Sequence, residues 1–207
     1  NIRKFKGISK PEPASAPKTI KLGEKGSWED VQPYYSTYKG NTKPRDCAGR
    51  YNTYYKNTTG RNDIVGAKVT HDDKYIYFYV ETADKLTSSK DPNWMMLFID
   101  TDRDKKTGWN GYDYVINRTS PDGKNVVIEK SREGKWIWDT VGKGKFVVRG
   151  NVLEIAVEKN LFGLNPTIDI EFKWSDNMQD EGNIMDFYVN GDVAPGGRFN
   201  FVYTSKF

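Results

Sequence analysis

Three aspartates at alternate positions form the stretch of this sequence that is best suited to chemistry. Asp100, Asp102 and Asp104 follow an apolar run, and Asp113 lies beyond a turn that contains two glycines. A Ca²⁺ ion prefers about six to eight oxygen ligands, and alternate carboxylates in a tight turn supply several of them. Like charges this close repel one another unless a cation, a basic partner or water separates them. We therefore expect either a structural Ca²⁺ held by these four acids or a strongly solvated turn.

The residues around the aspartates keep both alternatives open. Lys105 stands where an EF-hand loop needs glycine, and Gly111 stands where it needs the final glutamate, so the segment is not an EF-hand. Arg103, Lys105 and Lys106 are also placed to neutralise the acids locally, without a metal ion.

Aromatic residues beside polar ones indicate carbohydrate recognition. Sugars bind flat aromatic faces through their C–H surfaces, while polar side chains satisfy the hydroxyl groups. Trp109 stands in a turn between two glycines with Tyr112 close behind it, and Trp174 ends an apolar run shortly before Asn177. We expect these four side chains, together with Arg61, to bind a glycan. The alternative is that Trp109 and Trp174 cap the two ends of the hydrophobic core.

The sequence gives little support for a catalytic site. The chain has one histidine, His71, and one cysteine, Cys47, and His71 stands in a polar turn where we expect it to be solvated. The sequence shows no glycine-rich phosphate loop, zinc signature or serine nucleophile motif. Among 28 acidic residues some pair will always lie close, so their number alone is weak support for a glycosidase. We therefore expect no catalytic residues.

Charge and hydropathy exclude further classes. The 32 basic and 28 acidic residues are well mixed and give a formal charge of +4. No basic stripe long enough to follow a phosphate backbone is present, so nucleic-acid binding is not expected. No apolar stretch reaches the length that would cross a bilayer, so no membrane span is expected. Cys47 has no partner for an internal disulfide.

The candidate residues must be positioned by a scaffold, and its signals are those of β structure. Aromatic residues make up 14% of the chain, and 19 glycines and 9 prolines indicate many turns. About ten to twelve short strands at regular spacing predict an all-β fold, an antiparallel β-sandwich of jelly-roll type. The strands are expected at Ile64–Thr70, Lys74–Glu81, Trp94–Asp100, Tyr112–Asn117, Asn125–Lys130, Lys135–Trp138, Phe146–Arg149, Asn151–Glu158, Ile168–Trp174, Met185–Val189 and Arg198–Tyr203, and a single helical turn at Asn160–Leu164.

The first 60 residues have a different character. Residues 1–19 contain Pro11, Pro13 and Pro17 and are expected to form an extended linker or N-terminal extension, joined to something upstream. Residues 20–207 then form the sandwich domain. Within it, residues 20–60 show no regular strand or helix pattern. We expect their isolated aromatic side chains to pack against an edge of the sandwich and so hold long loops there.

Several short motifs occur in an order typical of one group of sandwich domains. They are Trp28–Val31, the hairpin His71–Phe78, Phe98–Asp100 followed by Lys106–Gly108, and Leu153–Val157 before a turn at Leu161. In this order they resemble the family 9 carbohydrate-binding modules and the wider DOMON-like group. The resemblance covers about residues 20–205.

The resemblance implies a jelly roll with structural calcium and a sugar clamped between two aromatic side chains. The second clamp tryptophan of that family falls near residues 187–189, where this chain has Tyr188. The resemblance also implies an accessory module, joined to an upstream catalytic domain in a bacterial polysaccharide-degrading protein that is secreted, periplasmic or on the cell surface.

We therefore expect a non-catalytic carbohydrate-binding module. One rival interpretation is a calcium-stiffened spacer that packs against a neighbouring domain and binds no sugar. Another is a small glycosidase or polysaccharide lyase, which would need two acids about 5–10 Å apart in a cleft. Exposure of Trp109 and Trp174 in a groove would favour sugar binding, and their burial would favour the spacer.

Overall fold

The structure is a computed structural model that describes residues 5, 7, 10–50, 52–164 and 167–205, and it is almost entirely β. Its strands are β1 (Tyr34–Ser36), β2 (Arg45–Ala48), β3 (Tyr54–Asn57), β4 (Ile64–His71), β5 (Tyr75–Thr82), β6 (Met96–Asp100), β7 (Tyr114–Ile116), β8 (Asn125–Ser131), β9 (Trp138–Arg149), β10 (Val152–Glu158), β11 (Ile168–Asp176), β12 (Asp192–Ala194) and β13 (Phe201–Ser205). The described helices, η1 (Lys159–Phe162) and α2 (Asp186–Val189), are too short to cross a membrane.

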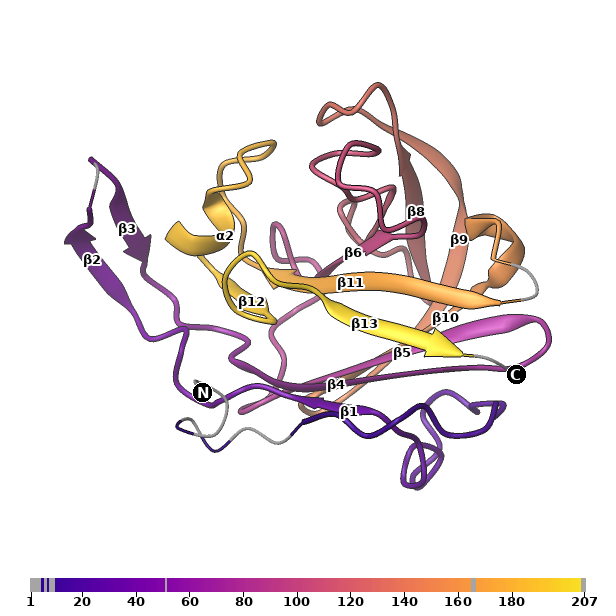
Figure 1. Ribbon diagram of the computed structural model, residues 1–207. Helices are drawn as coiled ribbons and strands as arrows, with labels where there is room; N and C mark the ends of the chain where they lie inside the picture. Colours follow the sequence, from indigo (N-terminus) through magenta and orange to yellow (C-terminus); the bar gives the residue numbers. More distant parts are fainter. Residues whose placement is uncertain (1–4, 6, 8–9, 51, 165–166, 206–207) are drawn as a thin grey trace.

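Most of these strands belong to one antiparallel sheet that curls over on itself (Figure 1). Among the described residues it has 11 strands in the order β1–β4–β5–β10–β9–β8–β7–β6–β11–β12, and β13 pairs with β11 beside β12. The curl brings β4 and β5 over β11 and β13, so that two layers enclose the core. This arrangement confirms the expected antiparallel sandwich. The β2–β3 hairpin is a separate pair that projects from one end.

Strand β5 shows why both faces of one layer are covered. Ile76, Phe78 and Val80 are fully buried in the main core between the layers. The alternate tyrosines point outward, where Tyr77 packs with Trp28 and neighbouring apolar residues of the segment that precedes β1. A strand covered on both sides is apolar or aromatic at nearly every position, as this sequence is.

The described part of the proline-rich segment lies against the sandwich. The backbone N–H of Ser15 donates to Gln32, and the N–H of Lys18 donates to the carbonyl of His71. Ala14 packs against the main core. Residues 10–19 therefore follow the domain surface, and residues 1–4, 6 and 8–9 of the expected linker lie outside the described residues.

Some expected elements differ from those observed. Met185–Val189, expected as a strand, is largely the helix α2, and Asp186 at its start accepts the backbone N–H groups of Gln179 and Asp180. One long strand, β9, includes the expected strand Phe146–Arg149, but it contains only Trp138 of the expected strand Lys135–Trp138. His71 is buried rather than solvated: its Nδ1 lies 2.9 Å from the hydroxyl of Tyr203, and burial lowers its pKa.

Candidate functional site

The two tryptophans expected to face solvent are buried, so that expectation is wrong. Trp174 has 0% of its surface exposed and lies in the main core, whereas Trp109 has 2% exposed and lies in a second apolar cluster. The ring of Trp109 packs edge to face on Trp136 at 4.5 Å between centroids and tilts against Phe98 at 5.6 Å. Neither indole offers a face to a sugar.

The turn that carries Trp109 explains its burial. Gly108 and Gly111 both have positive φ, and a Cβ on Gly108 would lie 2.2 Å from the carbonyl oxygen of Tyr112. Only glycine permits so close an approach. The chain therefore folds back tightly over the outer face of β6 and β7, and this presses Trp109 and Tyr112 onto the sheet.

Three other expected sugar-binding residues also serve the scaffold. The guanidinium of Arg61 bonds to the buried carboxylate of Asp176 at 2.9 Å and also lies 3.6 Å from Asp91. Tyr112 is buried and donates its hydroxyl to Asn200, and Asn177 is buried with positive φ. These positions brace loops and do not belong to the lining of the groove described next.

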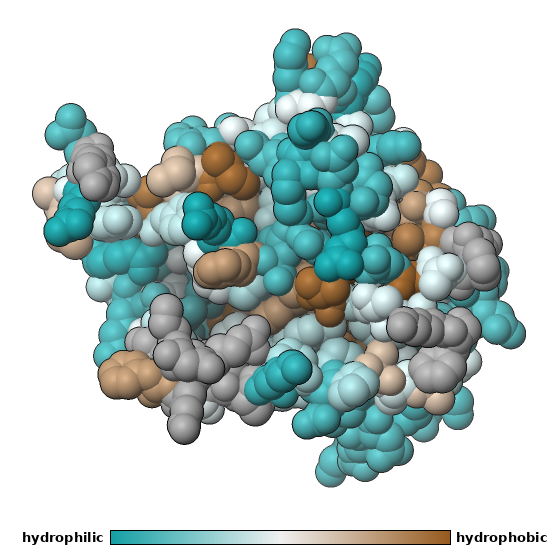
Figure 2. Space-filling model, viewed as in Figure 1, coloured by the Kyte–Doolittle hydropathy of each residue, from teal (hydrophilic) through white to brown (hydrophobic). Residues whose placement is uncertain are grey.

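Of the residues expected to bind a sugar, Tyr188 lines a groove on the surface. A groove of about 1140 Å³ is lined by residues of the β2–β3 hairpin, of α2 and of the loop from β12 to β13. Figure 1 shows where these elements lie. Apolar side chains show on this face of the molecule near α2 and the β12–β13 loop (Figure 2). The lining residues are Ser36, Thr37, Tyr38, Asn41, Arg45, Tyr55, Phe187, Tyr188, Gly191, Asp192, Val193, Pro195, Gly196, Gly197, Phe199, Asn200 and Phe201.

The groove presents aromatic rings to water from different walls. Tyr38, after β1, is 42% exposed, and Phe199, in the β12–β13 loop, is 69% exposed. Tyr55 of the hairpin and Tyr188 of α2 are half-buried and stand beside them in the lining. These rings are the surface on which a flat apolar ligand face would lie.

Polar groups stand among the rings. The side-chain oxygen of Asn41 is buried and accepts no hydrogen bond within the part of the chain that the structure describes. Arg45 donates from Nη2 to the carbonyl oxygen of Asn190 at 3.1 Å. Asn200 is already engaged, since it accepts from Tyr112 at 2.7 Å and donates to Glu171 at 2.9 Å.

Two buried charged groups support the floor and one wall. The carboxylate of Asp192 accepts the backbone N–H of Ile64 at 2.7 Å and of Val193 at 2.8 Å, and burial raises its pKa to about 7. The ammonium of Lys173 donates to the carbonyl oxygens of Pro195 at 2.6 Å and Gly197 at 2.9 Å, and burial lowers its pKa to about 7. Lys173 thereby ties the β12–β13 loop to β11.

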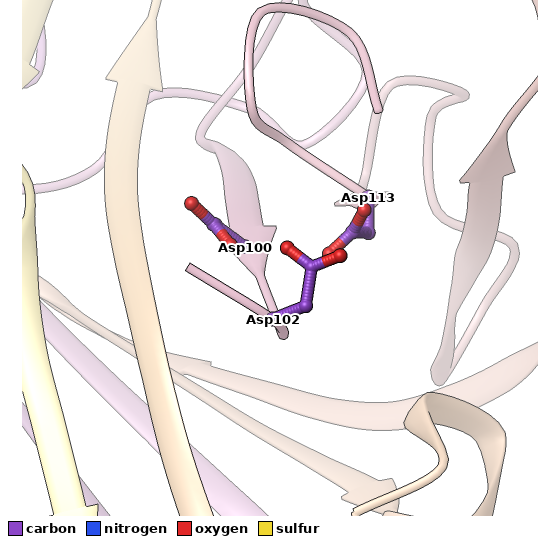
Figure 3. Close-up of side chains that lie close together, drawn as sticks. All are labelled: Asp100, Asp102 and Asp113. Carbon is purple, nitrogen blue, oxygen red and sulfur yellow. The ribbon is translucent and has the colours of Figure 1, made fainter. Parts of the chain in front are cut away.

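The acidic loop forms a separate cluster (Figure 3). Oxygens of Asp100, Asp102 and Asp113 lie within 4.8 Å of one another, and Asp104 is not part of this group. Asp100 is buried, which raises its pKa, and it accepts the ammonium of Lys105 at 2.6 Å. The donor set is all carboxylate, which suits a hard cation, and Lys105 competes for the same oxygens.

The groove residues Tyr38, Tyr55 and Phe199 did not stand out in the sequence. Tyr38 and Tyr55 belong to the segment read as irregular, and Phe199 belongs to a segment expected to be a strand. One usable signal was present: Phe199 is a large apolar residue among Gly196, Gly197, Arg198 and Asn200, a composition typical of an exposed loop.

Comparison with protein-family models, with curated proteins and with solved structures gives no significant match. Function is therefore inferred from the geometry of the groove.

Proposed function

We propose that this domain is a non-catalytic glycan-binding module and that the groove between the β2–β3 hairpin, α2 and the β12–β13 loop is its binding site. The observation that carries the proposal is the pair of exposed rings, Tyr38 and Phe199, on different walls of an open groove. The order of sequence motifs, which resembles the family 9 carbohydrate-binding modules, supports the same role. In that role the domain is an accessory to an upstream catalytic domain in a secreted, periplasmic or cell-surface bacterial protein.

The chemistry of the groove suits a sugar chain. A pyranose has an apolar face that stacks on an aromatic ring, and each good stack contributes about 1 kcal/mol. Its hydroxyl groups need partners, and the polar side chains of Ser36, Thr37 and Asn41 belong to the groove lining. Two stacks with a few hydrogen bonds give dissociation constants roughly in the micromolar to millimolar range.

The lining favours binding over hydrolysis. Glycosidases usually act with two carboxyl groups about 5–10 Å apart. Among the described residues that line this groove, Asp192 is the only carboxylate, and two backbone N–H groups already occupy it. This supports a site that holds a sugar without cleaving it.

The proposal is tested with ring-removing variants and soluble polysaccharides. We expect Tyr38→Ala and Phe199→Ala each to weaken binding roughly fivefold, the equivalent of one stack. Tyr54→Ala is the matched control, because Tyr54 is 55% exposed on β3 but does not line the groove. Isothermal titration against a broad polysaccharide panel measures all three. The proposal fails if no polysaccharide binds, or if the two groove variants bind as well as the control.

A second function is favoured by the burial of Trp109 and Trp174. Both indoles brace the scaffold, as a stiff spacer between domains requires. A spacer would bind no polysaccharide, so the same titrations separate the two functions.

We also propose that Asp100, Asp102 and Asp113 hold a structural Ca²⁺. Bound there, the ion would neutralise three carboxylates. It would also link the end of β6 to Asp113, which directly precedes β7. Lys105 would have to release Asp100 on metal binding. Calcium-dependent thermal stability tests this assignment independently of sugar binding.

A further inference from the structure

We propose that the glycan recognised by the groove is anionic, carrying carboxylate or sulfate groups, and that Arg45 binds them. This inference rests on the proposed glycan-binding function. It follows from where the positive charge of the chain lies, and from which of its arginines lack an acidic partner.

The excess of positive charge is concentrated in the segment that supplies one wall of the groove. Residues 33–60 hold five basic side chains and one acidic side chain, Asp46, whereas the remaining sequence holds 27 of each sign. The whole formal charge of +4 therefore lies in the segment that contains β1, β2 and β3. The five basic residues are Lys39, Lys43, Arg45, Arg50 and Lys56. A local field of one sign raises the concentration of oppositely charged ligands near the surface.

Arg45 is the basic residue of this wall that lines the groove. It is half-buried, and its Nη2 atom donates to the carbonyl oxygens of Val189, Asn190 and Gly191 at 3.1 to 3.4 Å. These contacts fix the guanidinium in place but leave its charge without a counter-ion. Among the described residues no carboxylate lies within 4.0 Å of it, and its Nε and Nη1 atoms donate no hydrogen bond.

Arg61 shows what a structural arginine looks like in the same molecule. Its guanidinium contacts the carboxylates of both Asp176 and Asp91, so its charge is neutralised internally. Arg45 is held only by neutral carbonyl groups. A planar guanidinium with free donors matches the two oxygens of a carboxylate or sulfate group.

Two further basic residues near the groove agree with an anionic ligand. Arg198 is exposed in the β12–β13 loop. Burial raises the pKa of Tyr188, and the nearby positive charge of Arg198 offsets part of that rise. Lys173 lies beneath the same loop. Asp192 in the floor opposes them, but its carboxylate is buried and already accepts two backbone N–H groups.

The experiment compares polymers matched in everything except charge. Polygalacturonate is titrated beside its carboxyl-reduced form, and dextran sulfate beside dextran, each at low and at high sodium chloride. We expect at least one charged polymer to bind at least about tenfold more tightly than its neutral partner, and to lose most of that advantage at high salt. The two pairs show whether carboxylate or sulfate is the preferred group.

Variants assign the effect to Arg45. Arg45→Gln should weaken binding of the charged polymer at least about tenfold, because hydrogen bonds to charged groups are the stronger ones. Arg50→Gln is the control, since it removes the same charge from the hairpin outside the groove lining and should change affinity less than about twofold. Thermal melting confirms that both variants fold. If Arg45→Gln does not fold, the salt dependence of wild-type binding still tests whether the ligand is anionic.

The outcomes separate this inference from the function on which it rests. Equal binding of neutral and charged polymers, unaffected by salt, overturns the anionic ligand and leaves glycan binding intact. Absence of binding to all four polymers and to the wider panel overturns both. Double-stranded RNA bound more tightly than any polysaccharide, with the same loss in Arg45→Gln, would replace the glycan by a nucleic acid.

Discussion

Two aromatic regions of this molecule have similar composition and opposite surroundings. The second apolar cluster gathers Phe98, Trp109 and Trp136 on the outer face of the sheet, where the turn before β7 closes over them. The groove gathers Tyr38, Tyr55, Tyr188 and Phe199, and no loop among the described residues closes over it. The difference teaches that an aromatic residue beside glycines is not by itself a binding surface. What decides its role is whether the adjoining backbone folds back on it.

The largest loss of stability should come from a substitution in the second apolar cluster. Trp109→Ala removes a buried indole from contacts with Phe98 and Trp136 and leaves a cavity, which should cost about 3–5 kcal/mol of unfolding free energy. Urea denaturation measures the loss. A change of less than about 1 kcal/mol would contradict the assignment of Trp109 to the scaffold. Trp109→Phe, which keeps most of the apolar volume, should lose much less.

Arg61 should also behave as a scaffold residue. Arg61→Ala leaves the buried carboxylate of Asp176 without its partner, which should cost roughly 3 kcal/mol in stability. Polysaccharide affinity at a temperature where the variant remains folded should be unchanged. If instead stability is kept and affinity is lost, Arg61 belongs to the binding site after all.

The lysine beneath the groove should give stability a pH dependence. Burial lowers the pKa of Lys173 in the folded state to about 7, whereas in the unfolded state the pKa has its ordinary, higher value. Between these two pKa values the unfolded state binds more protons than the folded state. The wild type should therefore gain stability as pH rises from about 7 to about 10, by at most about 1.4 kcal/mol for each unit of pKa difference. Lys173→Met should lack this gain. Parallel curves of unfolding free energy against pH for the two proteins would refute it.

Calcium should stabilise the acidic loop by a smaller amount. At about 100 times its dissociation constant, an ion that binds only the folded state adds about 2.7 kcal/mol, and a chelator removes that gain. Differential scanning calorimetry with calcium and with chelator measures the shift. Asp102→Asn should abolish it, whereas Asp104→Asn should not, because Asp104 is not part of the cluster. No shift in the wild type with either reagent would rule the metal out.

The sequence allowed the scaffold to be predicted better than the site. Alternation of apolar residues and short turns located β4, β5, β10 and β11, because both signals are local to each strand. The acidic cluster was partly predicted for the same reason, since Asp100 and Asp102 are neighbours in one loop. The helix α2 was missed because its start is fixed by Asp186 bonding to residues that precede it, whereas the residues themselves favour a strand.

The groove could not be predicted in the same way. Its walls come from residues near 40, near 188 and near 199, which only the complete fold brings together. Tyr188 was found through resemblance to a family rather than through its own neighbours. The strands β2 and β3, which carry Arg45 and Tyr55, lie in a segment without a clear hydrophobic period, so the sequence does not predict the hairpin that forms one wall.

The most direct test of the open groove compares Phe199→Ala with Trp109→Phe in one set of titrations and melts. If the groove is the glycan site, Phe199→Ala loses affinity roughly fivefold at an unchanged melting temperature. Trp109→Phe should then melt lower and bind as tightly as the wild type. The reverse pattern, with affinity lost on changing Trp109 and kept on changing Phe199, would contradict the groove as the site of recognition.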